Sequence, residues 1–270
     1  MGWRVAGEGR RTRGGPGRTV VRVIDVRRSG DRYRGSEPPS GISSLHAFSF
    51  GRYYDPDNLR FGPLLACNEE RLAPGAGFDE HPHSHTEIVT WVTEGELTHQ
   101  DSTGHTTVVR PGDVQHLSAA SGVRHVERND GPTPLAFLQM WLAPLTWDGT
   151  PAYSLIRRED LPQDHPDTVV LTLPAAAATL HHLQLTPGRP QPLPEAPLRY
   201  VHVLNGEVRF GPAPAEAPSG APEADVRHGA PAAELGPGDS ARIGAPAEGP
   251  LTLMAHGETS AELLVWAMEG

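Results

Sequence analysis

Lysine is absent from the 270-residue sequence, so all 23 basic side chains are arginines. This absence excludes chemistry that needs a lysine amine, such as Schiff-base formation, a pyridoxal phosphate linkage and the lysine of a P-loop. The single cysteine, Cys67, can form neither an internal disulfide nor a thiolate metal site. Any bound metal must therefore be held by nitrogen and oxygen ligands.

Long hydrophobic runs are also missing. No stretch approaches the roughly 18 apolar residues of a membrane span. The Arg-rich residues 1–18 contain no apolar segment of the length that a signal peptide needs, so we expect a disordered N-terminus and a cytoplasmic protein. A formal net charge of −10 argues against binding to nucleic acid or to an anionic membrane.

Residues that break helices are abundant, with 30 Gly and 28 Pro. Between them lie short segments rich in β-branched and aromatic residues, of which 87–93, 106–109 and 136–142 are typical strands. The pattern predicts an all-β fold built as an antiparallel sandwich or barrel.

The two halves of the chain resemble one another. The turn at Gly95 recurs 111 residues later at Gly206, and the Pro-Gly-Asp turn at Gly112 recurs 126 residues later at Gly238. The extra length falls in 211–233, a Pro-, Ala- and Gly-rich segment that we expect to be a flexible loop. We predict tandem domains over 19–148 and 149–270, with the linker at 144–151.

Half of the 14 histidines lie between His81 and His125. His81 and His83 are two residues apart, so on a strand both imidazoles project from the same face, and His125 and Glu127 do the same. If these strands meet inside a barrel, the four side chains converge. Three imidazoles and one carboxylate suit a first-row divalent metal and leave positions open for an oxygen-bearing substrate or dioxygen.

Five segments of this region together resemble the pirin family of bicupins: 77–83, 87–95, 99–104, 110–115 and 121–127. Segment 49–56 is similar to the bacterial, quercetinase-like branch. The resemblance is dense from 48 to 142 and weak afterwards. It implies two tandem cupin domains with one metal in the first. The sequence departs from the common family pattern at 84–86 and at Val126, which stands where a serine is usual.

The resemblance implies that the metal is bound at His81, His83, His125 and Glu127. Fe(II) is the expected ion, with Ni, Mn, Cu, Co and Zn as alternatives. It further implies quercetin 2,3-dioxygenase-like ring cleavage of a flavonol, or of a related enol or catechol, with O2 as co-substrate. Glu127 is the expected general base for the substrate hydroxyl.

A non-catalytic alternative is a metal-binding, redox-sensing module that acts through a protein partner. A eukaryotic member of the family is known as an iron-dependent transcriptional co-regulator. In either case we expect a monomer.

The second half is predicted to lack the metal. The two offsets equate His81 and His83 with Pro192 and Pro194. They equate His125 and Glu127 with Leu251 and Leu253. None of these four residues can bind a metal.

Other candidates have weaker support. His85 is expected to turn away from the site, and Glu87 to accept a hydrogen bond from a ligand imidazole or to form a cross-strand salt bridge. Cys67 is expected to be a small buried hydrophobic residue. We expect surface or hydrogen-bonded structural roles for His99, His105 and His116. Adventitious binding at the surface is the expected role of the pair His181 and His182. We expect core positions for Trp91 and Trp141.

Overall fold

The computed structural model describes residues 24–36, 40–163, 165–212, 233–244 and 250–270. The segment predicted to be disordered, 1–18, and nearly all of the predicted loop 211–233 lie outside these residues. The described chain consists of antiparallel strands and three short 3-10 helices, which confirms the all-β prediction. None of the helices in this part of the chain is long and apolar enough to span a membrane.

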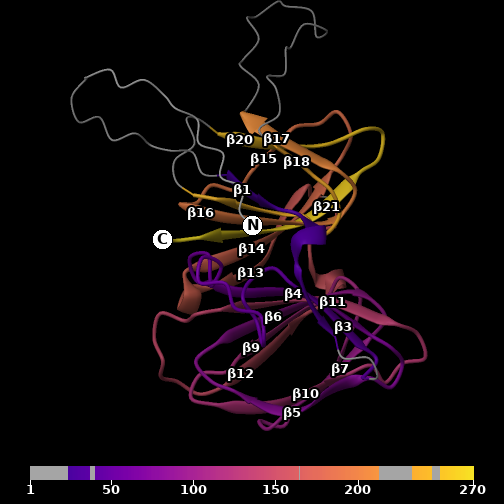
Figure 1. The fold of residues 1–270 in the computed structure, drawn as a ribbon, viewed down its shortest axis with the longest axis vertical. Coiled ribbons are helices and arrows are strands. Elements are labelled where there is room, and N and C mark those ends of the chain that lie inside the picture. The colour runs from indigo at the N-terminus through magenta and orange to yellow at the C-terminus, as the bar shows by residue number, and fades with distance from the viewer. Residues whose placement is uncertain (1–23, 37–39, 164, 213–232, 245–249) are drawn as a thin grey trace, which may run out of the picture.

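The N-terminal half forms a large and a small sheet (Figure 1). The large sheet has seven strands in the order β12 (Ala152–Ile156), β9 (Val114–Ser118), β6 (Glu87–Glu94), β11 (Leu135–Leu142), β4 (Leu64–Leu72), β3 (Ile42–His46) and β2 (Tyr33–Ser36). The small sheet has the order β5 (Gly77–His83), β10 (Val123–Arg128), β7 (Leu97–Asp101) and β8 (Thr106–Val109).

The C-terminal half repeats this plan. Its large sheet has six strands in the order β1 (Ile24–Arg27), β19 (Ser240–Ile243), β16 (Leu198–Asn205), β21 (Ala261–Met268), β14 (Ala178–Leu185) and β13 (Asp167–Leu173). Its small sheet has the order β15 (Gln191–Pro192), β20 (Leu251–Ala255), β17 (Val208–Pro212) and β18 (Ala233–Leu235). The 3-10 helices are η1 (Ser29–Asp31), η2 (Arg158–Asp160) and η3 (Pro174–Ala176).

The equivalent strand orders confirm a bicupin built from two related β-barrels. Two edge strands do not pair within the predicted domains, 19–148 and 149–270. β12 follows that boundary but pairs with β9 of the first barrel, and β1 begins the described chain but pairs with β19 of the second. The long-range pairing of an edge strand leaves no mark in local sequence, which is why the predicted boundaries did not anticipate it.

The two large sheets pack against each other in the centre of the molecule (Figure 1). Val89, Leu138 and Met140 of the first barrel share one buried cluster with Leu180 and Trp266 of the second. Strands of the first large sheet are therefore covered on both faces, which accounts for the nearly continuous apolar run of β11. Cys67 is buried in the same cluster, as predicted, and burial raises the pKa of its thiol to about 11.

A buried arginine links the barrels beside this apolar cluster. Arg32 Nη1 lies 2.9 Å from Glu69 Oε1, and Arg32 Nη2 donates to His202 Nδ1 over 3.0 Å. Burial, followed by the Arg32 charge, lowers the pKa of His202 well below its ordinary value, so this imidazole is neutral and can accept the hydrogen bond.

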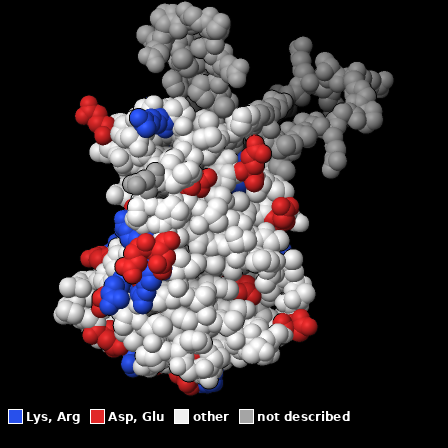
Figure 2. All heavy atoms as spheres, turned by 180° about the vertical axis from the view of Figure 1, so that it is seen from behind, with Lys and Arg blue, Asp and Glu red and all other residues white. Residues whose placement is uncertain are grey.

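Charged side chains on the outer surface are mixed in sign. On the face shown in Figure 2, arginines lie beside aspartates and glutamates, and no extended basic patch is seen among the described residues of this face. This face therefore offers no electrostatic footprint for a polyanion.

Candidate metal centre

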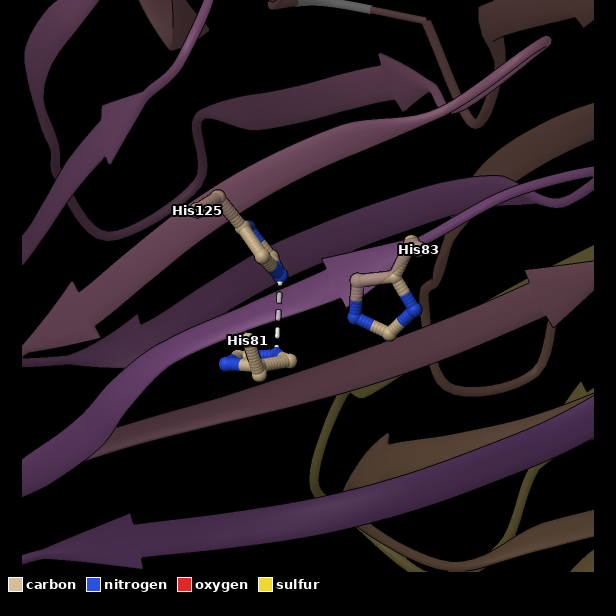
Figure 3. A group of neighbouring side chains, drawn as sticks. All are labelled: His81, His83 and His125. Atoms are coloured by element: carbon tan, nitrogen blue, oxygen red, sulfur yellow. Dashed lines mark hydrogen bonds between the residues drawn. The ribbon is translucent and has the colours of Figure 1, made fainter.

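Three histidines meet inside the first barrel because of strand pairing. β5 and β10 are antiparallel neighbours, with His81 directly opposite His125 and His83 opposite Val123. His81 Nε2 and His125 Nε2 are 3.0 Å apart (Figure 3). The His83 ring lies with its centroid 4.8 Å from that of His81 and 4.9 Å from that of His125. The two-residue spacing that predicted a shared face therefore brings these imidazoles together.

The ring nitrogens of these histidines suit a metal ion. His81 Nδ1 donates to the backbone carbonyl of Asp79 over 2.7 Å, which leaves the Nε2 lone pair pointing at His125. His83 Nε2 and His125 Nδ1 are buried without a hydrogen-bond partner. Two nitrogens bound at right angles to one ion at about 2.1 Å would lie about 3.0 Å apart. The observed Nε2 separation matches this value.

Burial keeps two of these imidazoles neutral. It lowers the pKa of His83 to about 4, with further contributions from His125 and His81. It lowers the pKa of His125 to about 3, again with a contribution from His81. A neutral imidazole is the form that binds a metal, so both side chains are ready to act as ligands at neutral pH.

Glu127 lies in the same barrel and is held by two amides. The side chain is buried, and it accepts hydrogen bonds from Gln115 Nε2 over 3.1 Å and from Gln139 Nε2 over 2.7 Å. Donor atoms of His81, His83 and His125 form one group within 4.8 Å of one another. Glu127 belongs to an overlapping group with His99 and His125. The assignment of all four predicted residues to one ion thus stays a prediction.

His99 has the second of its two predicted roles, that of a structural residue, and does not lie at the surface. It is fully buried in the middle of β7, opposite Glu127. Its Nε2 lies 3.1 Å from Asp101 Oδ2, and its Nδ1 is buried without a partner. Burial opposes ionisation of Asp101, but hydrogen bonds from Thr103 and His99 outweigh it and hold the pKa of this carboxyl well below its ordinary value. The alternation of residues 97–101 could have revealed that His99 faces inward.

Tyr153 was missed by the sequence analysis because it lies on β12, beyond the predicted domain boundary. Its ring stacks on that of His99 with centroids 4.8 Å apart and on that of His105 with centroids 4.9 Å apart. Its hydroxyl donates to Gln115 Oε1 over 3.2 Å. A chain of hydrogen bonds therefore runs from Tyr153 through Gln115 to Glu127.

An aromatic cavity of about 450 Å³ lies beside the histidines. Its lining includes Phe50 and Phe78, and the Phe78 ring centroid is 6.4 Å from that of His81. The Trp141 ring contacts one lining residue and one of the histidines, with centroid distances of 5.1 Å to Phe50 and 4.9 Å to His83. Trp141 is partly buried and packs against one of the buried core clusters, so its predicted core role holds in part. Trp91, by contrast, lies in the core as predicted.

The second barrel fills the corresponding position with apolar side chains. The register of β20 with β17 and β15 places Leu193, Phe210, Leu251 and Leu253 where the first barrel has His81, His99, His125 and Glu127. All four lie in one buried hydrophobic cluster. The predicted equivalents Pro192 and Pro194 were wrong by one residue, because the Leu193 N–H donates to the Leu251 carbonyl.

The other predicted residues lie outside the three-histidine group. His85 turns away with φ = 56° and packs against Trp147. Glu87 does not meet a ligand imidazole. Its carboxylate contacts His116 Nε2 at 2.6 Å, which is the predicted cross-strand alternative. His105 is exposed, as predicted.

His181 and His182 do not form a surface pair. They bind different carboxylates, those of Asp167 and Glu262. Both rings are half-buried. Adventitious metal binding at these two residues stays a prediction.

Comparison with known proteins gives consistent matches. The family model described as Pirin matches residues 28–142. A Mycobacterium tuberculosis protein named "Putative quercetin 2,3-dioxygenase Rv0181c" is 38% identical over 200 residues, which are 70% of this chain and 81% of the relative. Escherichia coli "Quercetin 2,3-dioxygenase" is 39% identical over 132 residues, 48% of this chain and 56% of the relative.

Two solved structures of the E. coli protein YhhW have the same fold. The first aligns with a TM-score of 0.74 and 26% identity and covers 91% of this chain and 97% of YhhW. The second is of the bacterial pirin YhhW in complex with nickel(II). It aligns with a TM-score of 0.72 and 25% identity and covers 91% of this chain and 99% of YhhW.

Proposed function

Because this chain belongs to the pirin family, we propose that it is a metal-dependent dioxygenase that cleaves a flavonol, or a related enol or catechol, with O2. One observation carries the proposal. Three imidazoles, one of them buried and two half-buried, converge beside an aromatic cavity of about 450 Å³, which is large enough for a flat substrate of two or three rings. The names of the bacterial relatives support the same activity.

We assign the metal to His81, His83, His125 and Glu127. The unpartnered Nε2 of His83 and the short distance between the Nε2 atoms of His81 and His125 fit a nitrogen- and oxygen-bound divalent ion. Nickel in YhhW supports a divalent transition metal, and Fe(II) is our choice among the candidates. The ion would supply the Lewis acidity and electron transfer that chelation and O2 activation require.

Glu127 is placed to take the proton of a substrate hydroxyl. Its two carboxylate oxygens each accept one amide hydrogen bond, which fixes the side chain and leaves a lone pair on each oxygen. Tyr153 fixes Gln115 in turn. We therefore propose that Glu127 is the general base, positioned by the two glutamines.

The aromatic side chains would hold the substrate and exclude water. Phe50 and Phe78 line the cavity and would supply aromatic surface for a flat substrate. Trp141 contacts both Phe50 and His83 and would lie beside the bound substrate. A dry environment strengthens the electrostatic contribution of every charged group inside the site.

The test is oxygen consumption and carbon monoxide release with quercetin, for protein loaded separately with Fe, Ni, Mn, Cu or Co. We expect turnover with at least one ion and its loss in His81→Ala and His125→Ala. His181→Ala is the matched control because this half-buried histidine lies in the second barrel. Absence of turnover with every metal, or unchanged turnover in His125→Ala, would contradict the proposal. The first result would favour the metal-binding module that acts through a protein partner.

A further inference from the structure

The aromatic cavity has a polar end that the metal ligands do not use. Its floor is made by β3 and β4, where Ser44 pairs directly with Glu70 in the antiparallel register. His46 lies two residues beyond Ser44, so its side chain projects from the same face of the sheet. All three residues are buried, and all three line the cavity.

Each of these side chains has hydrogen-bonding capacity left for a ligand. Ser44 Oγ donates a hydrogen bond to Glu70 Oε2. The other carboxyl oxygen, Glu70 Oε1, takes no part in this hydrogen bond. His46 is 6% exposed and lies opposite Asn68 on β4, and its buried Nδ1 makes no hydrogen bond of normal geometry. A buried polar atom without a partner costs free energy unless a ligand or water satisfies it.

The surroundings keep the polar end uncharged. Burial raises the pKa of Glu70 to about 8, and the nearby Glu127 contributes in the same direction. Burial also lowers the pKa of His46. At neutral pH the site therefore presents a neutral carboxyl group, a neutral imidazole and a hydroxyl. Such a set can both donate to and accept from a neutral O–H group, and it has no charge to attract an anion.

The rest of the cavity fits the ring that would carry such a hydroxyl. Phe50 stacks on His46 with ring centroids 4.8 Å apart and an interplanar angle of 27°. Tyr53 and Phe78 add further aromatic surface to the lining. An aromatic ring bound against this surface would have Ser44, His46 and Glu70 within the same cavity to meet its hydroxyl group.

We propose that Ser44, His46 and Glu70 form a subsite that binds a phenolic hydroxyl of the substrate, on a ring other than the one that chelates the metal. The inference rests on the proposed function for the identity of the chelating group. It adds that the enzyme selects polyhydroxylated aromatic substrates over those that carry only the chelating pair of oxygens.

The test compares two flavonols that share the chelating 3-hydroxy-4-keto group. Quercetin carries further hydroxyls on its other rings, whereas 3-hydroxyflavone carries none. Binding of each to the nickel-loaded full chain under argon is measured by quenching of tryptophan fluorescence, since Trp141 lies beside the cavity. We expect quercetin to bind about tenfold more tightly, the effect of one or two hydrogen bonds.

Variants at Glu70 separate hydrogen bonding from packing. Glu70→Leu should abolish the preference for quercetin by weakening its binding about tenfold, with 3-hydroxyflavone changed less than about threefold. Glu70→Gln should keep most of the preference because an amide also donates and accepts. Glu87→Gln is the matched control. Glu87 is also buried and accepts from a serine, Ser118, but it does not line this cavity.

An unchanged preference in Glu70→Leu, or an equal loss in Glu70→Gln and Glu70→Leu, would overturn the subsite. Melting temperatures of all variants identify any that fail to fold, and in that case Ser44→Ala provides the same comparison. Oxygen consumption is measured separately in air. Turnover without a preference for quercetin would refute the subsite alone, whereas a preference without turnover would refute the dioxygenase and leave the subsite standing.

Discussion

Gln139 is the residue whose replacement tests the support of Glu127 most sharply. Its Nε2 donates to Glu127 Oε2 over 2.7 Å, and its Oε1 accepts from Trp141 Nε1 over 3.0 Å. Gln139→Leu keeps the volume and removes both hydrogen bonds. Losing a hydrogen bond to a charged group costs about 2 kcal/mol, and leaving the partly buried indole N–H unpartnered costs about 1 kcal/mol more. We therefore expect a loss of about 3 kcal/mol in the free energy of unfolding.

For a chain of this size, that loss corresponds to a fall of about 6–12 °C in Tm, measured by calorimetry on metal-free protein. Metal affinity should fall about 10- to 100-fold in a competitive chelator titration, because Glu127 loses the contact that orients it. Gln184→Leu is the control, since Gln184 is exposed on β14 of the second barrel. If Gln139→Leu binds metal like the parent while its Tm falls, Glu127 is not a ligand that Gln139 orients.

Three further predictions concern stability. The folded state keeps a proton on Glu70 up to a pKa of about 8, so parent stability falls as pH rises from about 4.5 to 8. Glu70→Gln should lose this dependence and show a smaller fall in Tm between pH 5 and pH 9; an equal fall would refute the assignment. Arg32→Met should lower the free energy of unfolding by about 2 kcal/mol in denaturant titrations, because it leaves His202 and Glu69 without their guanidinium partner. Leu253→Ala should cost about 3 kcal/mol through a cavity in the second barrel, yet leave the bound metal unchanged by elemental analysis.

Local sequence was sufficient for the strands and for the three-histidine group. Alternation has a period of two along a strand, so the shared face of His81 and His83 follows from their spacing alone. The observed strand β6, Glu87–Glu94, differs by one residue from the predicted 87–93. The repeat of glycine turns also led to the correct architecture, because both barrels need the same hairpins in the same order.

Pairing between distant strands was beyond the reach of the sequence. His99 faces the site because β7 pairs with β10, and Tyr153 reaches it because β12 returns to the first sheet. Neither pairing is encoded within a few residues of these side chains. Gln139 carried a signal that was not used, since it is a polar residue in the otherwise apolar strand β11. A polar residue at such a position needs a buried partner, and here the partner is Glu127.

The most direct measurement is anomalous diffraction from crystals of the metal-loaded protein, recorded on both sides of the absorption edge of the bound ion. The account predicts one strong peak per chain inside the first barrel, within bonding distance of His81, His83, His125 and Glu127, and none inside the leucine-filled second barrel. A peak at other residues, or none in a sample with one bound ion per chain in solution, would contradict it.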